Sequence, residues 1–175
     1  MKQFILKYVY FFIFLVFLVG ILSFLNEIPK SNNQGSFKEY KNIEDVSKEV
    51  SAIKIYIPKY FPMNVKWPPA KIYAQKNPFV AIIVEFVNED NNVILSISQS
   101  SYKKFRYNGS IKFRNILEAS NYMLDGKDAF LYAGFCEDNL YCSKIEFDLD
   151  DYRIIVVGKF SLPELLMIAR SIDEK

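Results

Sequence analysis

FVAIIVEFVNEDNNVILSIS, residues 79–98, contains two apolar runs separated by a polar cluster. Residues 79–86 are apolar except for Glu85, which indicates a buried strand, and residues 93–98 indicate a second strand. The cluster at residues 88–92 consists of Asn, Glu and Asp, and Asn and Asp favour turns. The two runs therefore predict an antiparallel β-hairpin.

Further strands are predicted on both sides of this hairpin. Residues 127–133, 143–149 and 152–157 have strand-like patterns, and the turn signals Asp125-Gly126 and Asp150-Asp151 precede the first and last of them. On the N-terminal side, Ile53, Ile55 and Ile57 alternate with Lys54 and Tyr56. Four prolines then predict an irregular connection: Pro58, Pro62, Pro68 and Pro69.

Two helices complete the predicted domain. Asn42 is a suitable N-cap for a short helix in which Ile43, Val46 and Val50 recur at helical spacing. Ser161-Leu162-Pro163-Glu164 is a capping box with proline in the first turn. It precedes an apolar stripe made of Leu165, Ile168, Ala169 and Ile172. The fold class is α+β: a curved antiparallel β-sheet with a short N-terminal helix and a C-terminal helix packed on it.

A membrane anchor is predicted before this domain. Residues 8–25 carry no charge and are aliphatic or aromatic apart from Gly20 and Ser23. As a helix they would be about 27 Å long, close to the hydrocarbon thickness of a bilayer. Lys2 and Lys7 place the N-terminus in the cytoplasm. A cleaved signal peptide is the alternative, but no small-x-small cleavage site follows the apolar run.

These features divide the chain into three parts. Residues 1–26 are the signal-anchor transmembrane helix, 27–42 a polar, flexible tether, and 43–175 an extracytoplasmic domain. The predicted location is the cell membrane, with a single pass and the C-terminal domain outside. Without Lys2 and Lys7, the 22 basic residues become 20, equal to the 20 acidic ones, so nucleic acid is not an expected partner.

The two cysteines lie in the outer domain. Cys136 and Cys142 enclose five residues, and an oxidising compartment would let them form a disulfide that closes a hairpin. Free thiols and half of a metal site are the alternatives. A zinc site lacks ligands, because the chain has no histidine and no further cysteine.

The sequence does not indicate an enzyme. Histidine is absent, and none of the nucleophile, metalloprotease, phosphate-loop or dinucleotide motifs occurs. No cofactor or metal is expected. The acidic run at Glu146, Asp148, Asp150 and Asp151 lacks EF-hand spacing and is interpreted as the solvated face of a strand and its turn.

A basic segment is the most distinctive local feature. Asn108-Gly109 is a hairpin signal, and a three-residue loop would pair Phe105 with Phe113, giving an aromatic face and a cationic face. The cationic face is a candidate patch for an anionic partner. Alternatively, it is a charged sheet edge that prevents aggregation. Its candidate residues are Lys103, Lys104, Arg106, Lys112 and Arg114.

An aromatic cluster near the prolines is a second candidate site. It could form an apolar groove for lipid or peptide, or it could simply pack on the core. Its candidate residues are Tyr60, Phe61, Met63 and Trp67.

The order of motifs resembles a known family. The motifs are IPKYFP at 57–62, SISQ at 96–99, DGKDA at 125–129, YRIIVVG at 152–158 and SLPELLMIARSI at 161–172. This pattern resembles an uncharacterised bacterial extracytoplasmic domain often found C-terminal to the membrane helix of anti-sigma factors. It is also similar to the C-terminal domain of the periplasmic sigma-factor regulators. Phe147 stands where the family often has Trp, and Met63 follows the second proline where glycine is usual.

The resemblance implies a binding or sensing module with no catalytic residues. Only about seven residues precede the apolar segment, so a cytoplasmic sigma-binding domain is not expected. The predicted function is therefore a membrane-anchored, extracytoplasmic binding or regulatory module. Its expected partners are the membrane, through residues 8–25, and an envelope protein, a peptide or an anionic lipid. The alternative is a structural subunit of a membrane-associated envelope complex.

Overall fold

The computed structural model describes residues 14–18, 37–50, 54–106 and 109–174. The chain divides into two units, residues 1–34 and 35–175, and the fold described below belongs to the second. In the first unit, residues 14–18 are helical. The rest of the predicted anchor, including residues 8–13 and 19–25, lies outside the described residues. Within the described part of the chain, no helix is long and apolar enough to cross a membrane.

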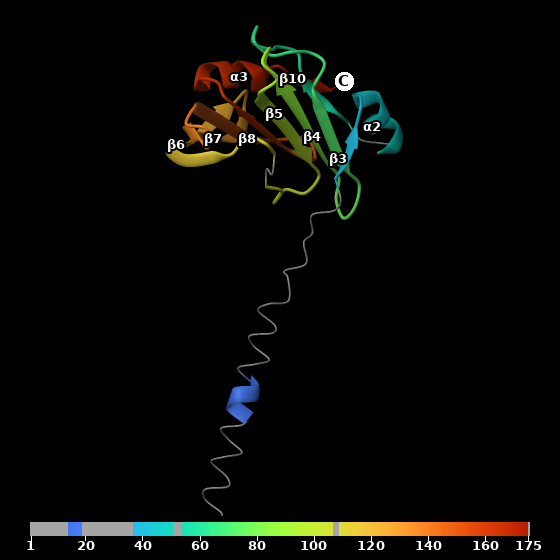
Figure 1. The fold of residues 1–175 in the computed structure, drawn as a ribbon, viewed down its shortest axis with the longest axis vertical. Helices are drawn as coiled ribbons and strands as arrows, with labels where there is room; N and C mark the ends of the chain where they lie inside the picture. The colour runs from blue at the N-terminus through green and yellow to red at the C-terminus, as the bar shows by residue number, and fades with distance from the viewer. Residues whose placement is uncertain (1–13, 19–36, 51–53, 107–108, 175) are drawn as a thin grey trace, which may run out of the picture. The chain divides into compact units, whose positions relative to one another are not determined.

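The second unit is built on an eight-stranded antiparallel sheet with short helices, an α+β arrangement (Figure 1). Strand β9 lies between β5 and β8, and it therefore joins an N-terminal group of strands to a C-terminal group. In spatial order the strands are β1 (Lys38–Tyr40), β3 (Lys71–Gln75), β4 (Ala81–Val87), β5 (Val93–Ser100), β9 (Tyr152–Gly158), β8 (Tyr141–Leu149), β7 (Lys127–Cys136) and β6 (Phe113–Leu124).

The hairpin predicted from residues 79–98 is confirmed. Strand β4 pairs with β5 in antiparallel register, with Glu85 opposite Ser96. The register shifts between Phe86 and Val87, next to the polar turn. The strands predicted at 127–133, 143–149 and 152–157 are also confirmed, within the slightly longer β7, β8 and β9.

Both predicted helices are present. Helix α2 (Ile43–Glu49) begins after Asn42, whose side-chain oxygen accepts a 2.8 Å hydrogen bond from the Asp45 N–H. Helix α3 (Leu162–Arg170) begins after Ser161, which donates its backbone N–H and its hydroxyl to Glu164 at 3.2 and 2.7 Å. These hydrogen bonds satisfy donors that a helix start otherwise leaves unpaired.

The apolar stripe of α3 is buried at Leu165, Ile168 and Ala169, where the helix packs against β8 and β9 (Figure 1). The fourth stripe residue, Ile172, lies beyond the helix and begins β10 (Ile172–Glu174). Strand β10 pairs with β2 (Tyr56–Pro58) in a separate two-stranded sheet. The strand predicted at 53–57 thus begins later than its pattern indicates; Ile53 lies outside the described residues.

The sheet buries side chains on both faces, because successive strand residues point to opposite sides. The helix face carries Phe86, Leu95 and Val156, which form one core cluster with Leu165 and Ile168 of α3. The opposite face, called the loop face below, carries a smaller cluster. Its members are Ala81, Ile83, Phe105, Ile111, Cys136, Cys142, Ile155 and Val157.

Besides β10, three further strands were not predicted. Strand β1 lies within the range 27–42, so the tether prediction is wrong for Lys38–Tyr40, which pairs with β3; residues 27–36 lie outside the described residues. Tyr40 packs against the helix-face core, and this burial explains why a polar stretch becomes part of the sheet. Strand β3 interrupts the predicted irregular connection. Strand β6 is a long edge strand whose exposed side chains give no clear alternation.

Candidate functional site

The basic segment does not form the predicted hairpin over its described residues. Residues 101–106 and 109–112 are turns, bends and irregular chain, and Phe113 pairs with Cys136 of β7 rather than with Phe105. Tyr107 and Asn108 lie outside the described residues. Phe105 and Ile111 are buried in the loop-face core. Packing of these two side chains onto the sheet is the physical reason that the segment lies across the sheet instead of pairing with itself.

A buried acid holds the segment in place. Glu85 of β4 is 1% exposed, and its carboxylate accepts hydrogen bonds from the backbone N–H and hydroxyl of Ser110, at 2.8 and 2.9 Å. A buried carboxylate without such partners would be costly. Glu85 therefore fixes the position of the segment that carries the basic residues.

The segment forms one wall of a cavity of about 950 Å³ on the loop face. The floor is provided by four adjacent strands: β9, β8, β7 and β6. The wall residues are Tyr102, Lys103, Lys104, Phe105, Arg106, Gly109, Ile111, Lys112 and Phe113. The floor residues are Arg153 and Val157 of β9, Lys144 and Glu146 of β8, Tyr132 of β7 and Ile116 of β6.

The cavity is strongly cationic. Its lining contains six basic side chains and one acid, Glu146. Four of the five predicted patch residues are among them: Lys103, Lys104, Arg106 and Lys112. The structure thus gathers most of the predicted patch around one concave site, together with Lys144 and Arg153.

Glu146 organises the floor. Its carboxylate forms an ion pair with Lys144 at 2.6 Å and another with Arg153. The Lys144 ammonium also lies 3.9 Å from the centre of the Tyr132 ring. Burial, and to a lesser extent the Glu146 charge, raises the pKa of Tyr132 above its ordinary value. The Nε of Arg153 is buried and has no hydrogen-bond partner within the described residues.

The rim carries the uncompensated charge. Lys103 lies 3.4 Å from Asp148, but Lys104, Arg106 and Lys112 have no ion pair with any residue that the structure describes. All three are exposed. Three such cations beside one cavity produce a positive potential that favours an anionic ligand.

Arg114 is not part of the cavity. Its guanidinium donates to Asn139 and borders a separate depression with Asn115 and Phe135. In β6 it follows Phe113, so alternation along the strand directs it away from the cavity.

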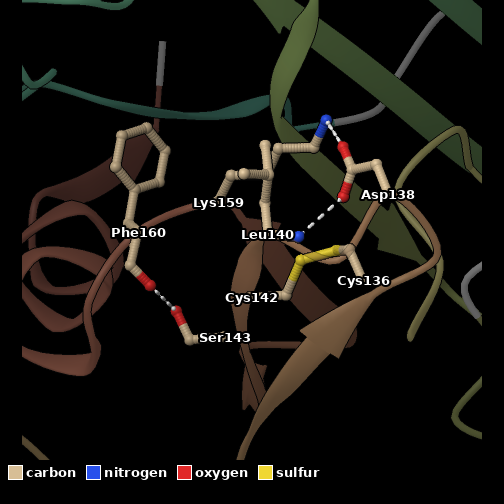
Figure 2. Close-up of a disulfide and its surroundings, with 7 residues drawn as sticks. All are labelled: Cys136, Asp138, Leu140, Cys142, Ser143, Lys159 and Phe160. Carbon is tan, nitrogen blue, oxygen red and sulfur yellow. Dashed lines mark hydrogen bonds and ion pairs between the residues drawn. A yellow bond between two sulfur atoms is a disulfide. The ribbon is translucent and has the colours of Figure 1, made fainter. Parts of the chain in front are cut away.

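The two cysteines support this face of the sheet. Cys136 and Cys142 are buried at disulfide distance, with Cα atoms 5.6 Å apart, at the turn between β7 and β8 (Figure 2). The neighbouring Glu137 N–H donates to the Lys112 carbonyl at 3.0 Å. The turn enclosed by the cysteines is therefore linked directly to the cationic segment.

An ion pair fastens the same turn to the end of β9. Asp138 lies 2.6 Å from the Lys159 ammonium and also accepts a hydrogen bond from the Leu140 N–H (Figure 2). The Lys159 hydrogen bond is the main cause that lowers the pKa of Asp138. A lowered pKa in the folded state means that this contact stabilises the protein above the unfolded-state pKa of Asp and is lost as pH falls through the folded-state pKa.

We therefore expect Asp138→Asn to reduce the free energy of unfolding by about 1 kcal/mol at pH 7, a small effect because the carboxylate is partly exposed. The difference should shrink below about pH 4 and disappear once the pH is below the lowered pKa of Asp138, where the Asp138 side chain is neutral like that of Asn. Urea unfolding at several pH values measures this effect. Asp128→Asn, on the exposed surface of β7, is the control and should change stability by at most a few tenths of a kcal/mol. An Asp138→Asn effect that does not depend on pH would contradict the assignment.

The four residues of the aromatic cluster, Tyr60, Phe61, Met63 and Trp67, differ in how far they are buried. Phe61 packs on Phe86 of the core with ring centres 5.0 Å apart, and Trp67 packs against Phe61 in a tilted arrangement with ring centres 5.6 Å apart. Trp67 remains 55% exposed, Tyr60 is also exposed, and the Met63 side chain is fully exposed. These contacts favour the alternative weighed for the cluster, packing on the core, for Phe61 and in part for Trp67.

Three charged residues of the cavity floor were missed by sequence reasoning: Lys144, Glu146 and Arg153. Glu146 was interpreted as part of a solvated strand face. They can be recognised from the register of the β8–β9 pairing, which places Lys144 and Glu146 on the same sheet face as Arg153. Among the described residues, no group of His, Cys, Asp or Glu could hold a metal ion.

The fold and the site together define an antiparallel α+β domain with a cationic cavity on one sheet face. Comparisons with family models, curated proteins and solved structures found no match to this chain.

Proposed function

We propose that this protein is a membrane-anchored, extracytoplasmic binding module of a regulatory or sensor-like kind, and that it binds an anionic partner in the cationic cavity. The observation that carries the proposal is the lining of that cavity, with six basic side chains around a single acid. A site of this composition recognises negative charge and does not require a catalytic step.

The arrangement of charge supports binding rather than stability. Lys104, Arg106 and Lys112 repel one another and have no ion-pair partner in the described chain. Like charges held together lower the stability of the free protein, whereas an anion between them gains from all three. Clefts lined with one sign of charge also accelerate the association of oppositely charged ligands.

The membrane location rests on the sequence. Residues 8–25 are long and apolar enough for an anchor, and Lys2 and Lys7 precede them. The cysteine pair at disulfide distance suits an oxidising compartment, which supports a domain outside the cytoplasm. The relation to the outer domains of anti-sigma factors stays a prediction from the motifs quoted above.

Photo-crosslinking in intact cells tests the proposal. A photoreactive amino acid replacing Lys104 is expected to capture a specific protein, peptide or lipid, which mass spectrometry identifies. The matched control is the same substitution at Lys71, an exposed lysine of β3 outside the cavity. Equal labelling patterns from the two positions would contradict binding in the cavity.

A structural subunit of an envelope complex is the second candidate. Large apolar side chains are exposed on the edge strand β6 and its neighbour β7: Ile116, Leu117, Met123 and Phe130. Exposed apolar surface of this kind often marks a contact with another protein. If this candidate is correct, Phe130→Glu should release the protein from a larger complex on native gels, whereas Lys104→Gln should not.

A further inference from the structure

We infer that the ligand of the cationic cavity is a short acidic peptide segment, bound in an extended conformation, in which apolar side chains accompany the acidic ones. This inference rests on the proposed function, because it specifies the partner of the same site. Three independent properties of the cavity support it: its length, its apolar lining and its charge.

The cavity is too long for a single small anion. Its floor crosses β9, β8, β7 and β6, which are adjacent strands. At about 4.8 Å per strand, three inter-strand steps span about 14 Å. An extended peptide advances about 3.4 Å per residue, so about four to five residues fit this length. A lone phosphate or carboxylate would occupy only a fraction of it.

The lining is apolar between the charges. Phe105, Ile111 and Val157 of the lining are buried, while Phe113 and Ile116 of β6 remain partly exposed. Covering exposed apolar area is favourable by about 25 cal/mol per Å². A phosphate polymer has little apolar surface to offer these side chains. A peptide with aliphatic or aromatic residues between its acids has both kinds of group.

The basic residues of the cavity favour a peptide with negative charge. The rim cations Lys104, Arg106 and Lys112 have no ion pair in the described chain, whereas the floor cations Lys144 and Arg153 are held by Glu146. Acidic side chains are therefore expected to bind at the rim. Glu146 competes with the ligand for the two floor cations, so it limits affinity instead of contributing to it.

Titration calorimetry on the full chain in a neutral detergent tests the inference. The probes are a hexapeptide of alternating Glu and Leu, a hexapeptide of Glu alone, a hexapeptide of alternating Lys and Leu, and inorganic polyphosphate. The Glu-Leu peptide is expected to bind most tightly, and the Lys-Leu peptide should not bind. Raising the salt concentration should weaken binding, because the rim contacts are exposed.

Two variants give effects of opposite sign. The triple change Lys104→Gln, Arg106→Gln and Lys112→Gln is expected to weaken Glu-Leu binding about 30-fold, since each exposed ion contact contributes roughly threefold. Glu146→Gln is expected to strengthen it several-fold by freeing Lys144 and Arg153. The matched control is Lys48→Gln, Lys71→Gln and Lys76→Gln, which removes the same charge outside the cavity and should leave affinity unchanged.

The outcomes separate this inference from the proposed function. If polyphosphate or the Glu-only peptide binds as tightly as the Glu-Leu peptide, and the triple variant weakens it, the peptide class is wrong but anion binding in the cavity stands. If no acidic probe binds, or the triple variant behaves like its control, the cavity is not an anion site and both proposals fail.

Discussion

Replacing Ile168 with alanine is expected to lower the free energy of unfolding by about 3 kcal/mol, the largest effect of any single substitution proposed for this protein. Ile168 is fully buried, at 0% exposure, between α3 and the helix face of the sheet. Alanine removes three carbon atoms and leaves a cavity in a cluster that cannot fully collapse. The higher helix propensity of alanine offsets only a few tenths of a kcal/mol.

The adjacent residue supplies a matched control. Met167 lies in the same helix but is 45% exposed, so Met167→Ala removes a side chain of similar size without opening a core cavity. It should cost less than about 1 kcal/mol. Urea unfolding followed by circular dichroism compares the two variants. Similar losses for both would show that α3 does not hold the core as described.

Replacing both Cys136 and Cys142 with alanine is expected to destabilise the protein by about 3 kcal/mol. Cross-linking residues six positions apart restricts the unfolded chain by about 2 kcal/mol. The lost packing of two buried sulfur atoms adds about 1 kcal/mol, since both side chains are at most 2% exposed in the loop-face core. The loss should also loosen the cationic segment, because Phe105 and Ile111 share that core.

A reducing agent provides the control for this second prediction. It should lower the urea midpoint of the unaltered protein toward that of the double variant and leave the variant itself unchanged. Hydrogen exchange at the Phe105 amide, which donates to the Tyr102 carbonyl, should become faster in both cases. If the reducing agent does not change the urea midpoint of the unaltered protein, the disulfide does not form in solution.

Short sequence motifs predicted the helix starts and turns that are determined by neighbouring residues. The Asn42 cap, the Ser161–Glu164 capping box and the turns at Asp125 and Asp150 act over three or four residues, and the structure contains each of them. Asp125 and Asp150 both adopt positive φ, at 48° and 50°, which turn-favouring residues accept more readily than most.

Elements that depend on distant partners were not predictable in the same way. The basic segment was expected to pair with itself, but Phe105 and Ile111 are buried on strands far from it in sequence, and Ser110 binds Glu85. Strand β6 lies so close to β7 that a Cβ atom added to Gly134 would be 2.1 Å from the Asn115 carbonyl oxygen. Only tertiary structure reveals such a close approach.

The candidate site also has a part that the local sequence predicts and a part that depends on distant residues. Its rim was visible as a run of basic residues between 103 and 112, because these residues are neighbours in sequence. Its floor was not, because Lys144, Glu146 and Arg153 come together only when β8 pairs with β9 beneath the segment. Their own sequence contexts resemble ordinary strand surfaces.

The position of β9 between β5 and β8 has a consequence for how the protein is made. A chain that emerges N-terminus first completes β1 and β3–β5, and later β6–β8, before the strand that joins the two groups is available. Until then β5 and β8 each present an unpaired edge, which is a template for aggregation. Newly made chains should therefore depend on a holding chaperone until about residue 158 has emerged, and nascent chains truncated before β9 should be the most prone to degradation.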